Sequence, residues 1–175
     1  ENIVETPGEC IASLELLSAA ERKLQLHEWN DTEAAFPENA TIHQLFEERV
    51  LRDPGKTAIR DEGEESSYGQ LNASANRIAH HLLAIGIETE ELVGICMDRS
   101  AGCVAAMLGV LKAGGAYLPL DPDFPKARLQ WMLADAGVRM VIGGQASISP
   151  LDVPLPVDIH AIGKEGGNDA NPGLE

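Results

Sequence analysis

The chain has 175 residues, of which 44% are hydrophobic, and this is enough for one domain with an apolar core. Its 28 acidic residues outnumber its 13 basic ones, and the formal net charge of −15 would repel the phosphates of nucleic acids and of anionic lipids. Nucleic acid and membrane partners are therefore disfavoured.

The cysteines indicate neither a disulfide framework nor a zinc site. Cys10, Cys96 and Cys103 are odd in number, and none of them forms a C-x-x-C pair. No segment has the ~20 apolar residues that a membrane span needs, and the sequence does not start with the basic and apolar regions of a secretion signal. We expect reduced thiols and a cytoplasmic location.

Residues 1–40 are polar and acidic around a single helical signal. Ser18 and Glu21 have the spacing of a capping box, in which a hydroxyl and a carboxylate satisfy the free amides at a helix start. The helix is expected to reach about Trp29, but its apolar residues do not complete a stripe that could enter a core. We interpret residues 1–40 as an interdomain linker with a short docking helix.

A regular pattern begins at Thr41, where a second capping box occurs; a third follows at Ser67. The patterns predict, in chain order, a helix from Thr41 to Asp53, a strand over 57–60, a helix from Ser67 to Gly86 and a strand over 92–97. The last of these is a nearly continuous apolar run. Such a run is typical of a strand covered by helices on both faces, so we expect it to be central.

The second half continues the alternation. It predicts a helix capped by Ser100 and ended by Gly114-Gly115, a strand over 116–118 that Pro119 shortens or ends, a helix with Asp123 as N-cap and Pro125 in its first turn, a strand over 138–142, and a possible strand over 157–162. Strands that alternate with helices indicate parallel pairing through right-handed crossovers. We therefore predict a three-layer α/β fold over 41–163, with a mainly parallel sheet flanked by helices, and a loose polar tail over 164–175.

The search for chemistry yields no reactive constellation. The sequence has no G-x-x-x-x-G-K-[ST], no G-x-G-x-x-G and no G-x-S-x-G motif, and its histidines lack the i, i+4 spacing of a helical metal pair. The acidic runs around Glu64 and Glu90 fall in expected loops. We assign no catalytic, cofactor-binding or metal-binding residue.

The stretch from Leu111 to Pro122 combines several conformational constraints. It ends a helix, turns at two glycines, and closes with prolines around Asp121. A rigid turn after a strand could border a ligand crevice, because open α/β sheets bind ligands at the carboxyl ends of their strands. The residues alone favour a structural role.

The same stretch resembles the second core motif of amino-acid adenylation domains, which belong to nonribosomal peptide synthetases and to the adenylate-forming ligase superfamily. Ser66 to Leu71 resembles the first core motif, with Ser67 and Gln70 in place of threonine and glutamate, and residues 16–32 look like the linker after a condensation domain. The motif positions, which we interpret as packing and positioning residues, are Ser67, Tyr68, Gln70, Arg99, Ser100, Lys112, Gly114, Gly115, Tyr117, Pro119, Asp121 and Arg128.

This resemblance implies an incomplete adenylation domain, the first part of its large N-terminal subdomain. The parent would use ATP and Mg²⁺ to make an aminoacyl-AMP and would pass the acyl group to phosphopantetheine on a carrier domain. In the family, the phosphate loop and the catalytic lysine follow these motifs, so the chain alone is expected to bind no cofactor and to be inactive.

The expected partners are the remainder of the adenylation domain and the neighbouring condensation and carrier domains. Open sheet edges also predict self-association. Two alternatives remain: a non-catalytic interaction module that docks onto other synthetase domains, and a flavodoxin-like or dinucleotide-binding domain. The absence of a phosphate fingerprint disfavours the latter.

Overall fold

The computed structural model describes residues 8, 10, 17–61, 63–162 and 168–173. Its contacts divide the chain into two units, Glu1–Asn39 and Ala40–Glu175. In the first unit, α2 (Ala19–Lys23) continues into a π-helical turn, η2 (Leu24–Glu28). The expected capping box is confirmed, because the Glu21 amide donates to the Ser18 hydroxyl and the Ser18 amide donates to the Glu21 carboxylate. No residue of α2 or η2 is buried.

The second unit holds all the strands of the part of the chain that the structure describes. Its elements are α3 (Ile42–Arg52), β1 (Thr57–Asp61), β2 (Glu64–Ser67), α4 (Tyr68–Ala84), β3 (Leu92–Cys96), α5 (Ala101–Lys112), β4 (Ala116–Leu120), α6 (Lys126–Asp135), β5 (Met140–Gly143), α7 (Gln145–Ile148) and β6 (Leu155–Asp158). The expected caps form at Thr41, Ser67 and Ser100. None of the described helices is both long and apolar enough to cross a membrane.

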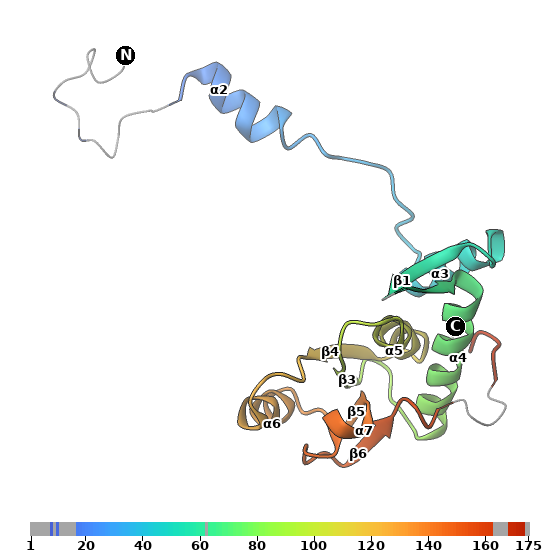
Figure 1. The fold of residues 1–175 in the computed structure, drawn as a ribbon. Coiled ribbons are helices and arrows are strands. Elements are labelled where there is room, and N and C mark those ends of the chain that lie inside the picture. Colours follow the sequence, from blue (N-terminus) through green and yellow to red (C-terminus); the bar gives the residue numbers. More distant parts are fainter. Residues whose placement is uncertain (1–7, 9, 11–16, 62, 163–167, 174–175) are drawn as a thin grey trace. The chain divides into compact units, whose positions relative to one another are not determined.

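The main sheet has four parallel strands in the order β4-β3-β5-β6. Helices α4 and α5 cover one face of the sheet and α6 covers the other (Figure 1). The three-layer α/β fold is thus confirmed. The central position expected for β3 is confirmed as well, and four of its five residues are buried.

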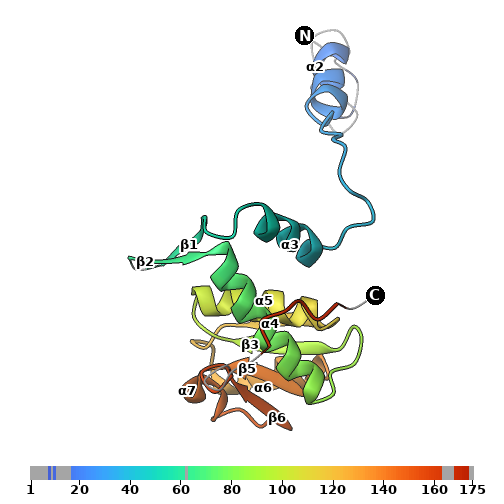
Figure 2. The same cartoon turned by 90° about the vertical axis from the view of Figure 1, so that its right-hand side faces the viewer.

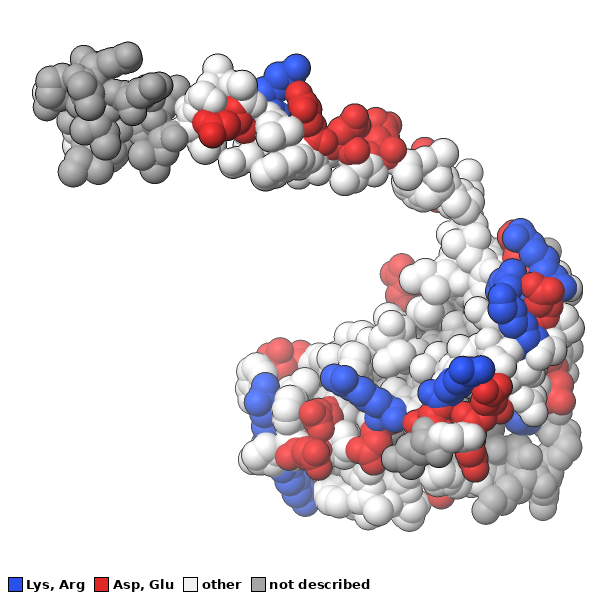
Figure 3. Space-filling view, turned by 45° about the horizontal axis from the view of Figure 1, so that its top comes forward, with Lys and Arg blue, Asp and Glu red and all other residues white. Residues whose placement is uncertain are grey.

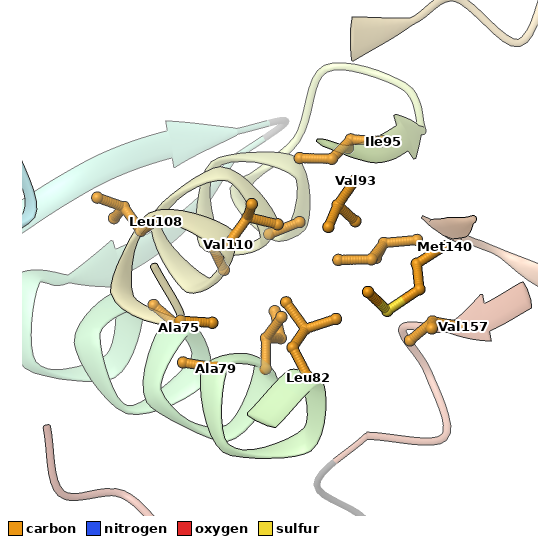
Figure 4. Close-up of a cluster of buried hydrophobic side chains, with 14 of the residues drawn as sticks. Ala75, Ala79, Leu82, Val93, Ile95, Leu108, Val110, Met140 and Val157 are labelled. Atoms are coloured by element: carbon orange, nitrogen blue, oxygen red, sulfur yellow. The ribbon is translucent and has the colours of Figure 1, made fainter. Parts of the chain in front are cut away.

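The core on the α4–α5 side consists mostly of alanine and branched aliphatic side chains. Figure 4 shows Leu82 of α4 beside the sheet residues Val93 and Met140, with Ala75 and Ala79 of the same helix in the same buried cluster. A second cluster packs α6 against the opposite face and contains the fully buried Cys96. Because this thiol has no exposed surface, it serves as a small apolar residue.

A β-hairpin departs from the sequence-based expectation. β1 does not join the parallel sheet, because it pairs antiparallel with β2 in a separate two-stranded sheet. The expectation that Glu64 and Glu65 lie in a loop is wrong. β2 has no apolar alternation to reveal it; cross-strand polar pairs stabilise it instead, with Glu65 bound to Thr57 at 2.8 Å and to Arg60 at 2.7 Å.

Three details of the second half also differ. Pro119 does not end its strand, which continues to Leu120; β4 is an edge strand, where a proline needs no partner on its open side. Helix α6 begins after Pro125, and Asp123 does not cap it. The last strand is Leu155–Asp158, also an edge strand, and not 157–162.

The polar tail makes contacts that the sequence does not predict. Residues 168–173 run beside α4 in both cartoon views (Figures 1 and 2) and hydrogen-bond to it. For these six residues the expectation of a loose segment does not match the structure, whereas positions 164–167, 174 and 175 lie outside the described residues.

Candidate functional site

A cleft of about 520 Å³ lies at the carboxyl ends of β3 and β4. One wall is the loop after β3, with Asp98 and Arg99, and the other is the segment that leaves β4, from Pro119 to Phe124. The chain passes from β3 to β4 on one side and then returns to β5 on the other side of β3. This reversal makes the end of β3 a topological switch point, the place where open α/β sheets bind ligands.

Local hydrogen bonds hold the wall after β4 in a tight turn. The Asp121 carboxylate accepts from the Asp123 amide at 3.0 Å, and the Asp121 carbonyl accepts from the Phe124 amide, also at 3.0 Å. The Arg128 guanidinium lies 4.0 Å from the centroid of the Phe124 ring. Arg128 therefore supports an aromatic side chain that lines the cleft.

The ionisable groups of the cleft are mostly acidic. Its described lining holds Asp98, Asp121 and Asp123 against one guanidinium, that of Arg99. Burial raises the pKa of the Cys103 thiol; burial, and then the charges of Asp121 and Asp98, raise the pKa of Cys96. Neither thiol is thus primed as a thiolate nucleophile. Within the described ranges, no group of three His, Cys, Asp or Glu side chains could hold a metal ion.

One face of the Ala40–Glu175 unit carries charges of both signs. In the view of Figure 3, its acidic and basic side chains are interspersed and form no single-sign patch. Some of these charges are paired within this unit: Arg49 with Asp53 on the next helical turn at 3.0 Å, and Arg139 with Glu91, 48 residues away in the sequence, at 2.9 Å. The described residues on this face therefore offer no strongly charged docking surface.

The comparisons with known proteins identify the family. The model of the family described as AMP-binding enzyme matches residues 46–167. The chain belongs to this family. The match includes every motif position that the sequence analysis singled out, from Ser67 to Arg128, and it includes both walls of the cleft.

Two similar proteins are synthases far longer than this chain. Bacitracin synthase 3 of Bacillus licheniformis is 43% identical over 142 residues, which are 81% of this chain and 2% of that protein. Gramicidin S synthase 2 of Brevibacillus brevis is 40% identical over 145 residues, or 83% of this chain and 3% of that protein. The chain thus spans only a few per cent of the length of these relatives.

Solved structures of the nonribosomal peptide synthetase FmoA3 have the same fold. The form with bound α-methyl-L-serine-AMP superposes with a TM-score of 0.71 at 30% identity, over 78% of this chain and 16% of that chain. The form with bound AMPPNP gives a TM-score of 0.75 at 29% identity, over 94% of this chain and 18% of that chain. The chain therefore resembles a part of FmoA3 that has the same arrangement of helices and strands.

The motif positions from the sequence analysis do not gather at one place in the structure. Arg99, Pro119 and Asp121 line the cleft, and Arg128 supports it through Phe124. Ser67 and Gln70 form the cap of α4, while Ser100 caps α5. Tyr68 packs on α3, with its ring 5.8 Å from that of Phe46, and Tyr117 lies half exposed on the edge strand β4.

The two glycines of the motif are required by the turn that they make. Gly114 has a φ of 80°, and a Cβ on Gly115 would lie 2.7 Å from a methyl of Ile87 and 3.0 Å from the carbonyl of Glu91. They return the chain from α5 into β4, and so they set the position of the cleft wall.

Lys112 lies apart from the cleft, buried at the end of α5. Its ammonium forms an ion pair with Glu47 of α3 and also donates to the side chain of Asn171. Burial lowers the pKa of Lys112, and the carboxylate of Glu47 opposes this effect. Sequence reasoning missed Glu47 and Asn171 as its partners; the one available signal was Asn76, a polar residue on the apolar face of α4.

Proposed function

We propose that this chain forms the first part of an amino-acid adenylation domain in a nonribosomal peptide synthetase. Three lines support the proposal: the AMP-binding family match, the similarity to bacitracin and gramicidin synthases, and the fold shared with FmoA3. In the parent, a carboxylate oxygen of the amino acid attacks the α-phosphorus of ATP, and pyrophosphate leaves. A phosphopantetheine thiol on a carrier domain then attacks the acyl carbon, and AMP leaves.

The single observation that carries the proposal is the cleft at the ends of β3 and β4. One of its walls runs from Pro119 to Phe124, which is the end of the Leu111–Pro122 stretch and the turn that follows, and a solved relative with this fold holds an aminoacyl adenylate. In this proposal the residues of the wall orient and enclose the bound groups.

The described residues do not fit ATP and Mg²⁺ by themselves. Transfer at phosphorus needs cations and amide donors that neutralise the phosphate oxygens. The described lining of the cleft offers one guanidinium, that of Arg99, against three carboxylates, and the sequence has no glycine-rich phosphate loop. Other parts of the parent must supply these groups, so the isolated chain would be catalytically silent.

The test is amino-acid-dependent exchange of pyrophosphate into ATP, measured with a panel of amino acids. We expect exchange from the synthetase module that contains this sequence and none from the isolated chain. Turnover by the isolated chain would refute the claim that it is silent. A folded module that exchanges with no amino acid would refute the parent activity.

A matched pair of variants in the module tests whether the cleft serves the reaction. Phe124→Ala removes an aromatic wall, whereas Trp131→Ala removes an aromatic that is 65% exposed on α6 and outside the cleft. Misplacing bound groups costs on the order of a hundredfold in rate when positioning is lost, so we expect kcat/KM to fall by about tenfold or more for Phe124→Ala. Trp131→Ala should leave the exchange rate unchanged, and equal effects would contradict this role of the cleft.

A second candidate function is docking of the Glu1–Asn39 unit onto another synthetase domain. Leu26 and Trp29 are 54% and 65% exposed on a short helical segment, which favours a partner that covers them. Calorimetry should detect binding to the condensation domain of the same synthetase, and Trp29→Ala should weaken it. Binding that occurs only with ATP would count against this function.

A further inference from the structure

Residues 168–173, here called the strap, are fastened to helix α4 by a series of polar contacts. The Arg77 guanidinium binds the Asp169 carboxylate at 2.6 Å, and the Asn76 amide donates to the Asp169 carbonyl at 2.6 Å. The ring Nε2 of His80 lies 2.8 Å from the Ala170 carbonyl, so it donates there. The strap thus follows one face of α4 (Figure 2).

Three donors converge on one atom of the strap, the side-chain oxygen of Asn171. They are the Nδ2 atoms of Asn72 and Asn76, at 3.1 and 2.9 Å, and the Nζ of Lys112, at 3.2 Å. We call these three side chains the socket. An amide oxygen has two lone pairs, so a third donor, one of them cationic, marks a place built for an oxygen.

Lys112 determines how the side-chain amides of Asn171, Asn72 and Asn76 are oriented. An ammonium has donors only, so Asn171 must turn its oxygen toward it, and Asn72 and Asn76 must then present their nitrogens. The side-chain oxygens of Asn72 and Asn76 are buried and have no hydrogen-bond partner among the described residues. Asn76 has no exposed surface at all, so solvent cannot supply a partner from outside. Such unsatisfied atoms are costly, and they are tolerated here because the nitrogens are committed to the strap.

From this convergence we infer that the socket of Asn72, Asn76 and Lys112 is a binding site for a carboxamide oxygen, and that its ligand is Asn171 of the same chain. The ligand, Asn171, follows Asn76 of α4 by 95 residues in the sequence. The strap thereby acts as a latch that joins α4 and α5 and covers the amine of Lys112, whose other side is held by Glu47 of α3.

The experiment measures how fast Lys112 is acylated. The folded chain is treated with an acetyl N-hydroxysuccinimide ester and then digested, and mass spectrometry of the peptides gives the extent of acylation at each lysine. Lys112 is 2% exposed, and Lys56 is an exposed internal reference. We expect Lys112 to react about tenfold or more slowly than Lys56, since it must wait for local opening.

The variants separate the ligand from the rest of the strap. Asn171→Ala removes the oxygen, and we expect the reactivity of Lys112 to rise by about two- to tenfold, the range for one lost hydrogen bond. Asn171→Asp keeps an oxygen for all three donors and should preserve the protection. Asn168→Ala is the matched control, because its carboxamide oxygen accepts from the Ala170 amide, away from the socket.

Two results would overturn the inference: unchanged Lys112 reactivity in Asn171→Ala, or an equal rise in Asn168→Ala. If Asn171→Ala does not fold, Asn72→Ala decides, because it deletes one donor of the socket and leaves the strap sequence intact. It should raise Lys112 reactivity by about twofold or more while Lys56 stays constant. No change in that folded variant would equally refute a site for Asn171.

Discussion

The contact between α4 and α5 gives the sharpest test of the packing, at Gly109. A Cβ added at this position would lie 2.7 Å from a methyl of Ile78, 2.8 Å from the Ile78 Cβ and 3.0 Å from the carbonyl of Ala75. The last two atoms belong to or adjoin the backbone of α4, so no rotation of a side chain can relieve the clash. The helices would have to separate by about 1 Å to restore carbon contacts of about 3.5–4.0 Å.

Two effects of opposite sign decide the stability of Gly109→Ala. Alanine gains about 1 kcal/mol over glycine in a helix interior, whereas overpacking a tight core costs about 1–3 kcal/mol. Because moving α5 away from α4 would loosen the whole buried face of α4, we place the overpacking cost at the upper end of this range. The expected result is a net loss of about 1–2 kcal/mol in the free energy of unfolding.

Urea unfolding followed by far-ultraviolet circular dichroism measures this loss as a lower midpoint at constant slope. Gly102→Ala, in the same helix, is the control. Its new Cβ would come no closer than 3.4 Å to a neighbour, the end of the Met97 side chain, so we expect it to be neutral or more stable by up to about 1 kcal/mol. If Gly109→Ala is as stable as Gly102→Ala, the stability of the fold does not depend on the close approach of α4 and α5 at Gly109, and the reasoning is refuted.

Four further outcomes are expected. Gly143→Ala would set a Cβ 2.5 Å from the Cys96 carbonyl and from Ile148, and it should cost about 3 kcal/mol or abolish soluble expression. Ser67→Ala should lower the free energy of unfolding by about 1 kcal/mol, and Ser67→Gly by only a few tenths, as denaturation midpoints will show. The hydrogen bond from Arg139 lowers the pKa of Glu91, so this pair stabilises the fold above the usual carboxylate pKa and is lost as pH falls through the lowered value; Arg139→Met should remove that acid dependence in unfolding measured between neutral pH and pH ~3. Pro119→Thr should strengthen concentration-dependent dimerisation in size-exclusion chromatography, because it returns an amide donor to the edge strand β4.

The sequence predicts those features that depend on residues near one another in the chain. The serine and threonine caps of α2, α3, α4 and α5 follow from local patterns within a few residues, and each cap forms. The central position of β3 follows from a continuous apolar run, which only a strand covered on both faces can bury. The sequence also allows a crevice to be predicted beside the turn after β4, because the prolines and glycines around this turn restrict its conformation locally, independently of distant residues.

Features that depend on distant residues could not be predicted in this way. The strand β2 is polar and depends on pairing with β1, so its own four residues carry no periodic signal. Asp123 has the residue type of an N-cap, but its amide is bound to Asp121, and α6 starts without a side-chain cap. The socket combines side chains of α4 and α5 with the strap, and no local pattern links Asn76 to a partner 95 residues away.

The stretch from Leu111 to Pro122 joins the two sites of this structure. At its start, Lys112 is a member of the socket on the α4–α5 side, and at its end, Asp121 lines the cleft. Between them, Gly115 allows the close turn that brings β4 into register with β3, where Ala116 pairs with Leu92. A side chain on Gly115 would therefore move both ends of the stretch together, so Gly115→Ala should raise the reactivity of Lys112 and also impair pyrophosphate exchange by the parent module. Loss of exchange with full protection of Lys112 would show instead that the two sites are independent.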